Sequence, residues 1–271
     1  MEALFHAMER SQVCVGIDPH ASLLAAWRLP DTADGAREFS LGVVDELAGS
    51  VAALKPQSAF YERFGSAGIA ILEEPLALAR ARGVFTILDV KRGDIGSTMG
   101  AYADAYLRPG APLEADAITV SPFLGPGSLA PAVTLARKHA KGVFALCLTS
   151  NPDGPVVQHA TIAGSHGGSG SSVARAICEW ATSENSVAPT VGLVIGATVG
   201  DAVVRNGLDL VGSGAAILAP GLGAQGAQAR DLPAVFGTAV PQVLGSISRA
   251  ILQRGPGNMA QAVAEFEVRA P

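Results

Sequence analysis

Residues 84–98 read VFTILDVKRGDIGST, and this stretch decides how the rest of the chain is interpreted. Its first half is apolar and rich in β-branched residues, which is typical of a buried strand. Its second half crowds Asp89, Lys91, Arg92 and Asp94 into six positions. Side chains of a strand alternate between its two faces, so Asp89 and Lys91 point the same way, and Asp94 follows where the chain has turned. The stretch predicts an Asp-Lys-Asp cluster at a strand end, the alternative being a solvated loop with a surface salt bridge.

Seven further apolar runs occur along the chain, and several end in polar or charged residues. With residues 84–91, they form a set of eight predicted strands, the others being 13–20, 51–57, 115–122, 142–152, 191–198, 215–226 and 241–251. Helical periodicity is found between and around them, in a short opening helix, up to about Gly49 with an interruption at 30–35, and at 67–82, 126–139, 173–180, 200–207 and 259–268.

Eight strands that alternate with helices predict an α/β fold, a single (β/α)8 TIM barrel. A doubly wound sheet ordinarily uses about five to seven strands, so the count favours the barrel. No linker of domain scale interrupts the pattern, and we expect residues 1–271 to form one barrel domain. Active sites of such barrels lie at the carboxyl ends of the strands. Polar residues follow the predicted strands at Asp18, Lys55, Asp89, Lys91, Ser150, Gln225 and Arg249.

Composition narrows the class of protein. Hydrophobic residues make up 49% of the 271 residues and aromatic residues only 5%, so the core must consist mainly of Ala, Val, Leu and Ile. The net charge of -5 and the lack of a basic run argue against nucleic acid or an acidic membrane surface as partner. The three cysteines lack metal-binding spacing and predict reduced core thiols in a cytoplasmic protein. We recognise neither a signal peptide nor a transmembrane segment.

The charged residues predict a proton donor. A lysine ammonium flanked by carboxylates stays protonated, because the opposite charges outweigh partial burial. Lys55, Asp89, Lys91 and Asp94 form such an alternating set. Schiff-base chemistry would instead require a lysine whose pKa is lowered, so the pattern disfavours an aldolase mechanism. For Lys55 alone, a side chain that reaches along the surface to solvent is an equal alternative.

A phosphate site is predicted after the seventh and eighth strands. Pro220, Gly221, Gly223, Gln225 and Gly226 belong to the run APGLGAQG, in which glycines let backbone amides approach an anion. Arg249 follows one element later and can donate two hydrogen bonds to a phosphate. Barrels often bind phosphate between these two loops. A glycine-rich turn without a ligand is the alternative.

Two smaller features leave two interpretations each, and the histidines leave one. Ser150 and Asn151 at the end of the fifth strand either contact a ligand or form a turn before Pro152, and the turn is favoured. Asp18 either accepts hydrogen bonds from sugar hydroxyls or caps the following helix. The five histidines show no ligand spacing, so we expect no metal site and no Ser-His-Asp triad.

The motifs together resemble one family. LDVKRGDIGST is similar to the D-x-K-x-x-D-I signature of the orotidine 5'-phosphate decarboxylase family, and GIDPH, LKPQSAFYERFG, LTSNP and APGLGAQG resemble its longer bacterial subgroup, the form found in mycobacteria. The resemblance covers essentially the whole chain in the right order. The signature is shared with a wider suprafamily of sugar-phosphate decarboxylases and synthases, whereas its combination with the other motifs is more specific.

The resemblance implies roles for individual residues. Lys91 would protonate C6 of the pyrimidine as carbon dioxide leaves, with Asp89 against the substrate carboxylate. Lys55 would bridge Asp89 and a ribose hydroxyl, and Asp18 would hold the ribose. Ser150 would read the pyrimidine amide. The remaining substrate contacts would come from Asn151, Pro220, Gly221, Gly223, Gln225, Gly226 and Arg249, with Gln225 and Arg249 on the phosphate.

The same resemblance implies a homodimer with shared active sites. Asp94, Ile95 and Thr98 would reach into the partner's site. Gly96 stands where shorter relatives usually carry proline after the D-I pair, which alters the stiffness of the loop but not the charged roles.

We therefore expect a cytoplasmic, cofactor-independent carboxy-lyase that converts orotidine 5'-phosphate to UMP and carbon dioxide in de novo pyrimidine biosynthesis. Two alternatives stay open. One is a Mg²⁺-dependent sugar-phosphate decarboxylase or synthase of the same suprafamily. The other is a catalytically silent nucleotide-binding barrel.

Overall fold

Eight parallel strands form a closed barrel in the computed structural model, which describes residues 1–163, 170–223 and 226–267. Each strand pairs with the next in sequence, and β1 also pairs with β8, which closes the sheet. The strands are β1 (Val13–Ile17), β2 (Ala53–Pro56), β3 (Phe85–Arg92), β4 (Ala117–Val120), β5 (Gly142–Leu148), β6 (Val191–Ile195), β7 (Ile217–Pro220) and β8 (Val243–Ile247). The predicted barrel and its eight strands are confirmed.

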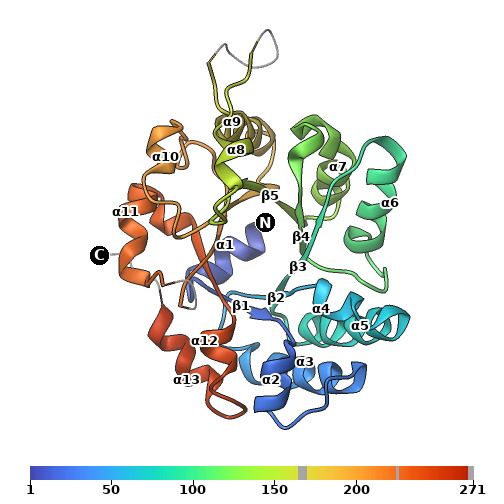
Figure 1. Ribbon diagram of the computed structural model, residues 1–271. Helices are drawn as coiled ribbons and strands as arrows, with labels where there is room; N and C mark the ends of the chain where they lie inside the picture. The colour runs from blue at the N-terminus through green and yellow to red at the C-terminus, as the bar shows by residue number, and fades with distance from the viewer. Residues whose placement is uncertain (164–169, 224–225, 268–271) are drawn as a thin grey trace.

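All helices except α1 surround the strands as an outer ring, in sequence order (Figure 1). The longer ones are α3 (Ala33–Leu47), α5 (Gly65–Ala81), α6 (Gly96–Leu107), α7 (Ala130–Lys138) and α9 (Val173–Asn185). Shorter ones are α1 (Glu2–Met8), α2 (Ala21–Ala26), α4 (Ala59–Glu62), α8 (Gly154–Gln158), α10 (Ala202–Arg205), α11 (Leu232–Phe236), α12 (Arg249–Leu252) and α13 (Met259–Val263). Short 3-10 turns complete the set at 122–124, 126–129, 229–231, 237–242 and 264–266.

Several predicted segments have bounds that differ from those of the strands and helices in the structure, and the last two along the chain show why. The eighth run was expected as one strand over 241–251, but β8 ends at Ile247 and Arg249 already begins α12. The last helix was expected over 259–268, but its α-helical part ends at Val263 and continues as a 3-10 turn, and Val268 lies outside the described residues. In both cases the apolar pattern continues through a change of backbone conformation, so periodicity alone misplaces the boundary.

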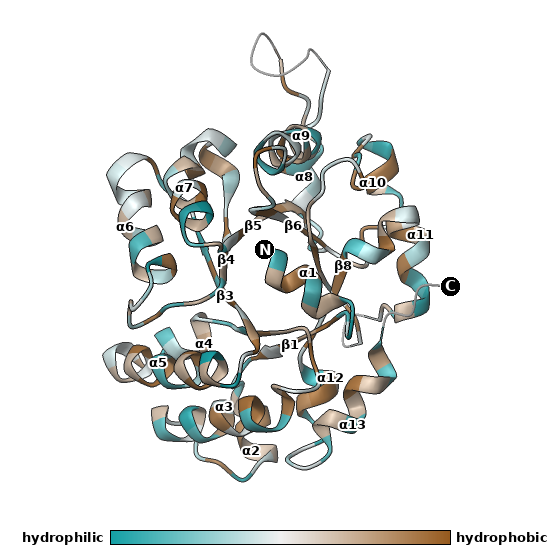
Figure 2. Ribbon diagram, turned by 180° about the vertical axis from the view of Figure 1, so that it is seen from behind, coloured by the Kyte–Doolittle hydropathy of each residue, from teal (hydrophilic) through white to brown (hydrophobic). Residues whose placement is uncertain are grey.

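The side chains on the outer and inner faces of the barrel wall belong to two separate hydrophobic clusters. Outward side chains of the strands pack under the helices, in a cluster that includes Val15, Leu88, Ile118, Val143 and Leu193. The strands and the helix surfaces facing them are largely hydrophobic (Figure 2). Inward side chains form the second cluster, with Cys14, Ala53, Ile87, Ala117, Phe144, Ala216 and Leu244. Because the wall is buried on both sides, its strands are apolar throughout rather than alternating.

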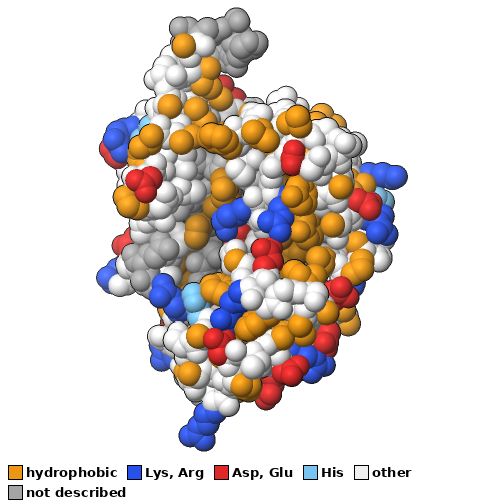
Figure 3. Space-filling view, turned by 45° about the vertical axis from the view of Figure 1, so that its right-hand side comes forward, with side chains coloured by type: hydrophobic (Ala, Val, Ile, Leu, Met, Phe, Trp, Pro, Cys, Tyr) orange, Lys and Arg blue, Asp and Glu red, His pale blue; other side chains and the backbone are white. Residues whose placement is uncertain are grey.

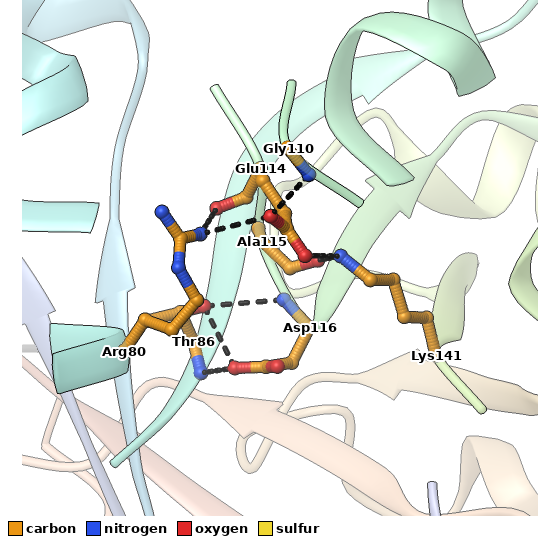
Figure 4. A network of polar contacts seen from close by, with 7 residues as sticks. All are labelled: Arg80, Thr86, Gly110, Glu114, Ala115, Asp116 and Lys141. Atoms are coloured by element: carbon orange, nitrogen blue, oxygen red, sulfur yellow. Dashed lines mark hydrogen bonds and ion pairs between the residues drawn. The ribbon is translucent and has the colours of Figure 1, made fainter. Parts of the chain in front are cut away.

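Helix α1 covers the amino-terminal end of the barrel. It lies at the centre of the ring of helices in both ribbon views (Figures 1 and 2), and its Leu4 and Met8 belong to the inward cluster. Polar contacts join the starts of neighbouring strands at the same end (Figure 4). Thr86 donates to Asp116 Oδ2 through its backbone N–H (2.8 Å) and its hydroxyl (2.9 Å), and Lys141 Nζ lies 2.7 Å from Glu114 Oε1. Helix α1 and these contacts thus occupy the amino-terminal end of the barrel, and the cavity described below opens at the other end.

The cysteines behave as core residues. Cys14, Cys147 and Cys178 are free thiols and all are buried, as the sequence predicts. Burial raises the pKa of each, to about 12 for Cys14 and about 11 for Cys178, so the thiols are neutral at physiological pH. Across residues 1–163, 170–223 and 226–267, no helix has the length and apolar character needed to cross a membrane.

Gly192 on β6 gives a test of packing inside the barrel. A Cβ atom there would lie 2.5 Å from the ring of the fully buried Phe144 and 2.9 Å from the carbonyl oxygen of Ala216. We expect Gly192→Ala to lower the free energy of unfolding by about 1–3 kcal/mol, measured by urea denaturation, because the ring must move within a closed wall. Gly42→Ala in α3 is the control. Its Cβ would lie at 3.5 Å from the Trp27 ring, and we expect a gain of at most about 1 kcal/mol. Equal unfolding free energies for Gly192→Ala and the unmodified chain would contradict this account.

Candidate active site

A cavity of about 350 Å³ opens at the carboxyl end of the barrel. Several of its lining residues lie two positions after an inward-facing core residue of the same strand and therefore face inward as well. Lys55 follows Ala53 in this way, Asp89 follows Ile87, and Thr119 follows Ala117. The full lining comprises Gly16, Asp18, His20, Lys55, Gln57, Asp89, Lys91, Thr119, Leu146, Thr149, Ser150, Val194, Leu218, Pro220, Gly221, Leu222, Ser246, Ser248 and Arg249. The face in Figure 3 is hollowed, and charged side chains gather near the hollow among hydrophobic ones.

Asp89 lies between two lysines at the bottom of this cavity. Its Oδ2 accepts a hydrogen bond from Lys55 Nζ at 3.0 Å, and its Oδ1 accepts from Lys91 Nζ at 2.6 Å. Side-chain exposure differs: 9% for Asp89 and 10% for Lys55, but 47% for Lys91. Both lysines line the cavity, and Lys91 is the more accessible of the two ammonium groups to a bound molecule.

Burial and charge act in opposite directions on this cluster. Burial alone would raise the pKa of Asp89, but the charges of Lys55 and Lys91 outweigh it and hold that pKa well below its usual range. Burial alone would lower the pKa of Lys55, but Asp89 and Asp18 outweigh it and raise that pKa above its usual value. Asp89 and Lys55 are thus charged across the neutral range, as the sequence predicts for this pair.

Asp94, by contrast, is not part of the cluster in its own chain. Its Oδ1 accepts a hydrogen bond from the backbone N–H of Ile95 at 2.8 Å, and among the described residues it does not line the cavity. The Asp-Lys-Asp grouping predicted at a single strand end is therefore not found in the cavity lining of one chain, as far as the structure describes it. Ile95, which is 63% exposed, and Thr98 also lie outside the cavity lining, as far as the structure describes it.

Asp18 faces the cavity rather than the next helix. The cap position of α2 belongs to His20, so the helix-cap interpretation of Asp18 is wrong. Its Oδ1 is buried and has no hydrogen-bond partner within residues 1–163, 170–223 and 226–267. A buried carboxylate oxygen without a donor is costly, and a ligand hydroxyl would satisfy it.

The predicted phosphate site is only partly assembled. Pro220, Gly221 and Arg249 line the cavity, and Arg249 has no ion-pair partner in the described part of the chain. Gly223 and Gly226 do not line it, and their N–H groups donate to the carbonyl oxygens of Ala227 and Gly223. The prediction that these two amides face an anion is therefore wrong for this conformation, since they are used inside the turn. Gln225 lies outside the described residues.

The loop after β5 supplies one of its two predicted residues. Ser150 lines the cavity together with Thr149. Asn151 is exposed, and its Oδ1 accepts a hydrogen bond from Thr149 Oγ1 at 2.6 Å. The carbonyl oxygen of Asn151 accepts a hydrogen bond from the backbone N–H of Gly154 at 3.1 Å, so Asn151 lies in the turn that the sequence favours.

Several cavity residues were not predicted from the sequence. Thr119 and Ser246 lie on the inward rows of β4 and β8, Ser248 lies directly after β8, and Leu146, Val194 and Leu218 form an apolar wall on β5, β6 and β7. Counting by two from the inward Ala117 would have found Thr119, but the sequence alone does not say which row faces inward. No group of three or more His, Cys, Asp and Glu suited to a metal ion occurs among residues 1–163, 170–223 and 226–267.

The fold and the site define a class of protein. A (β/α)8 barrel with fixed charges at the bottom of a cavity and an arginine at its rim is suited to bind a phosphorylated small molecule and stabilise charge that develops on it. The chain belongs to the orotidine 5'-phosphate decarboxylase family, because residues 11–266 match the model described as Orotidine 5'-phosphate decarboxylase / HUMPS family.

Individual relatives agree with this assignment. The chain is 50% identical to an orotidine 5'-phosphate decarboxylase of Salinispora arenicola over 97% of its own length and 92% of the relative. It is 52% identical to the enzyme of that name from Streptomyces coelicolor over 92% and 87% of the two chains. A crystal structure from Streptomyces avermitilis, assigned provisionally to the same enzyme, matches with a TM-score of 0.91 and 49% identity over 98% and 92% of the chains. The predicted family is thereby confirmed.

Asp89→Asn tests the electrostatics of the cluster. We expect it to lower the free energy of unfolding by about 3–5 kcal/mol at neutral pH, because Lys55 loses its charged partner in a buried place. The low pKa of Asp89 means that its ionised form contributes stability above the ordinary carboxylate pKa of about 3.9, and this contribution is lost as the pH falls through the depressed native pKa. Because the pKa of Lys55 is raised in the folded chain, its ammonium contributes its full share of stability below the ordinary lysine pKa of about 10.4, and this share is lost only at higher pH.

The difference between Asp89→Asn and the unmodified chain should therefore be constant from pH 5 to about 9 and shrink below about 4, measured by urea unfolding at each pH. Asp104→Asn is the control, because its ion pair with Arg108 is on the exposed side of α6 and should contribute little. A difference that widens toward acidic pH would contradict the assigned charges.

Proposed function

We propose that this cavity decarboxylates orotidine 5'-phosphate to UMP, with Lys91 as the proton donor at C6. The observation that carries the proposal is the arrangement of Lys91 Nζ, half exposed above a buried Asp89 that Lys55 holds from the other side. The two relatives of about 50% identity that bear the name of this enzyme support the same activity.

The chemistry requires a fixed cation. Breaking the bond between C6 and the carboxyl carbon releases carbon dioxide and leaves the electron pair on C6, where no conjugated system accepts it. The Lys91 ammonium stabilises this developing charge and transfers a proton from Nζ to C6, after which solvent reprotonates the amine. A cation that is already in place needs no reorganisation during the reaction. We propose no cofactor, since the proton and the charge both come from Lys91.

The other cavity residues would bind and orient the substrate. Asp18, with its unsatisfied Oδ1, and Lys55 would hold the ribose hydroxyls. Arg249 would bind the phosphate, and Ser150 would contact the pyrimidine. Binding energy from the remote phosphate can then be used to hold the pyrimidine against the charged cluster. Asp89 would lie next to the substrate carboxylate.

We further propose a cytoplasmic homodimer in which Asp94, Ile95 and Thr98 complete the partner's site. The support is that Asp94 is only half-buried and is not among the described residues that line its own cavity, and that Ile95 presents a large apolar side chain to solvent. A surface of this kind is suited to a two-fold interface, where each chain supplies the same residues to the other.

Lys91→Ala tests the proton donor. We expect its kcat to fall by at least about 100-fold while UMP binding is retained, because the variant loses the group that acts on C6 and keeps the phosphate and ribose contacts. The measurement is the loss of orotidine absorbance, with and without EDTA. Lys138→Ala on the exposed side of α7 is the control and should leave the rate unchanged. Turnover that survives in Lys91→Ala, or activity only on a sugar phosphate with added Mg²⁺, would contradict the proposal.

Mixing two inactive variants tests the shared site. A dimer of one Lys91→Ala chain and one Asp94→Ala chain has one site with both residues intact if Asp94 serves the partner. Random mixing should then restore about one quarter of the original activity. If Asp94 serves its own chain, the mixture stays as inactive as the separate variants.

A further inference from the structure

Lys91 lies in an irregular part of β3. Leu88 pairs with Ile118 and Arg92 pairs with Val120, so β3 advances four positions while β4 advances two. Lys91 has a φ of 45°, in the left-handed region that residues other than glycine rarely adopt. A strand bulge of this kind redirects side chains, and its unusual backbone persists only if neighbouring groups hold it.

Thr119 is the residue of β4 that faces this bulge. It lies between Ile118 and Val120, and it is 1% exposed. Its Oγ1 accepts a hydrogen bond from the backbone N–H of Lys91 at 2.9 Å and is 2.7 Å from Asp89 Oδ1. The ionised carboxylate can only accept, so the single hydroxyl proton of Thr119 must be donated to Asp89.

These contacts close a ring of hydrogen bonds around Lys91. The backbone N–H of Lys91 binds the Thr119 hydroxyl, the hydroxyl binds Asp89 Oδ1, and the same Oδ1 accepts from Lys91 Nζ. One buried hydroxyl is thus linked to both ends of the lysine, directly at the backbone and through Asp89 at the ammonium. A lysine side chain has four flexible bonds, and without such links its ammonium would sample many positions.

We propose that Thr119 is a positioning residue for the decarboxylation, which sets the direction of the Lys91 ammonium and holds the Asp89 carboxylate in place. The role rests on the proposed function. When Lys91 gives up its proton, Asp89 Oδ1 loses one charged donor, and the Thr119 hydroxyl remains to hold the negative charge. Thr119 makes its contribution through Lys91 and Asp89, and no contact with the reacting atoms is required.

Thr86 offers a matched control at the other end of the barrel. It is also a buried threonine, 3% exposed, and its hydroxyl binds the same two kinds of group, a backbone N–H and a carboxylate. It accepts from the backbone N–H of Asp116 at 3.1 Å and donates to the Asp116 carboxylate at 2.9 Å (Figure 4). Removing either hydroxyl leaves a buried N–H and a carboxylate each short of one partner. Only the Thr119 hydroxyl adjoins the proton donor.

The experiment compares Thr119→Val, Thr119→Ser and Thr86→Val on orotidine 5'-phosphate. Valine keeps the branched shape and removes the hydroxyl, while serine keeps the hydroxyl. We expect Thr119→Val to lower kcat by about 10- to 100-fold, the range of a hydrogen bond to a charged group, with KM and UMP affinity changed by less than about 3-fold. Thr119→Ser should recover kcat to within about 3-fold, and Thr86→Val should lower Tm while leaving kcat unchanged.

Two results would overturn the positioning role of Thr119. A Thr119→Val kcat within about 2-fold of the unmodified enzyme, or a fall of kcat in Thr86→Val as large as in Thr119→Val, would mean that the hydroxyl is only structural. If Thr119→Val does not fold, Thr119→Cys replaces it, because a thiol is a weak hydrogen-bond donor, and it should be at least about 10-fold slower than Thr119→Ser. An unmodified chain that does not decarboxylate orotidine 5'-phosphate would overturn the proposed function itself, whereas a fast Thr119→Val overturns the positioning role alone.

Discussion

The pairing of β1 with both β2 and β8 is the constraint on which the rest of the structure depends. A closed sheet has an interior that only alternate residues reach. At the amino-terminal end these inward rows are apolar and are covered by α1, and at the carboxyl end the same rows supply the cavity. The inner core and the site are therefore formed by the same inward-facing rows of side chains, at opposite ends of the barrel. A slip of one residue in any strand would exchange its inward and outward rows and remove its contribution to the site.

Within that interior, the buried carboxylate of Asp89 sets the electrostatics. Such a group is costly unless its charge is paired and its oxygens are hydrogen-bonded. Lys55, Lys91 and Thr119 together meet this requirement. The result is a charge arrangement that exists before any ligand arrives, which is the condition for electrostatic catalysis. The difference in exposure between the two lysines leaves one of them available for chemistry.

Much of this could be predicted from the sequence, for identifiable reasons. Strands buried on both faces leave continuous apolar runs, so all eight were found, and the polar residues that end them marked Asp18, Lys55, Asp89, Lys91 and Arg249. The amides of Gly223 and Gly226 were misassigned, because the sequence does not say whether an N–H is already used within its own turn. Asp94 was first grouped with its neighbours, because distance along the chain does not tell where a turn directs a side chain.

The sequence by itself determined the class of fold, the family and the identity of the charged residues, because these depend on periodicity and on residue types at fixed spacing. Only the tertiary structure decided which of those residues meet. The bulge in β3, the left-handed backbone of Lys91 and the placement of Thr119 opposite it depend on how β3 and β4 pair. Residues 84–98 specify the lysine and the aspartate, but the hydroxyl that joins them comes from the neighbouring strand, and strand pairing is a property of the closed barrel.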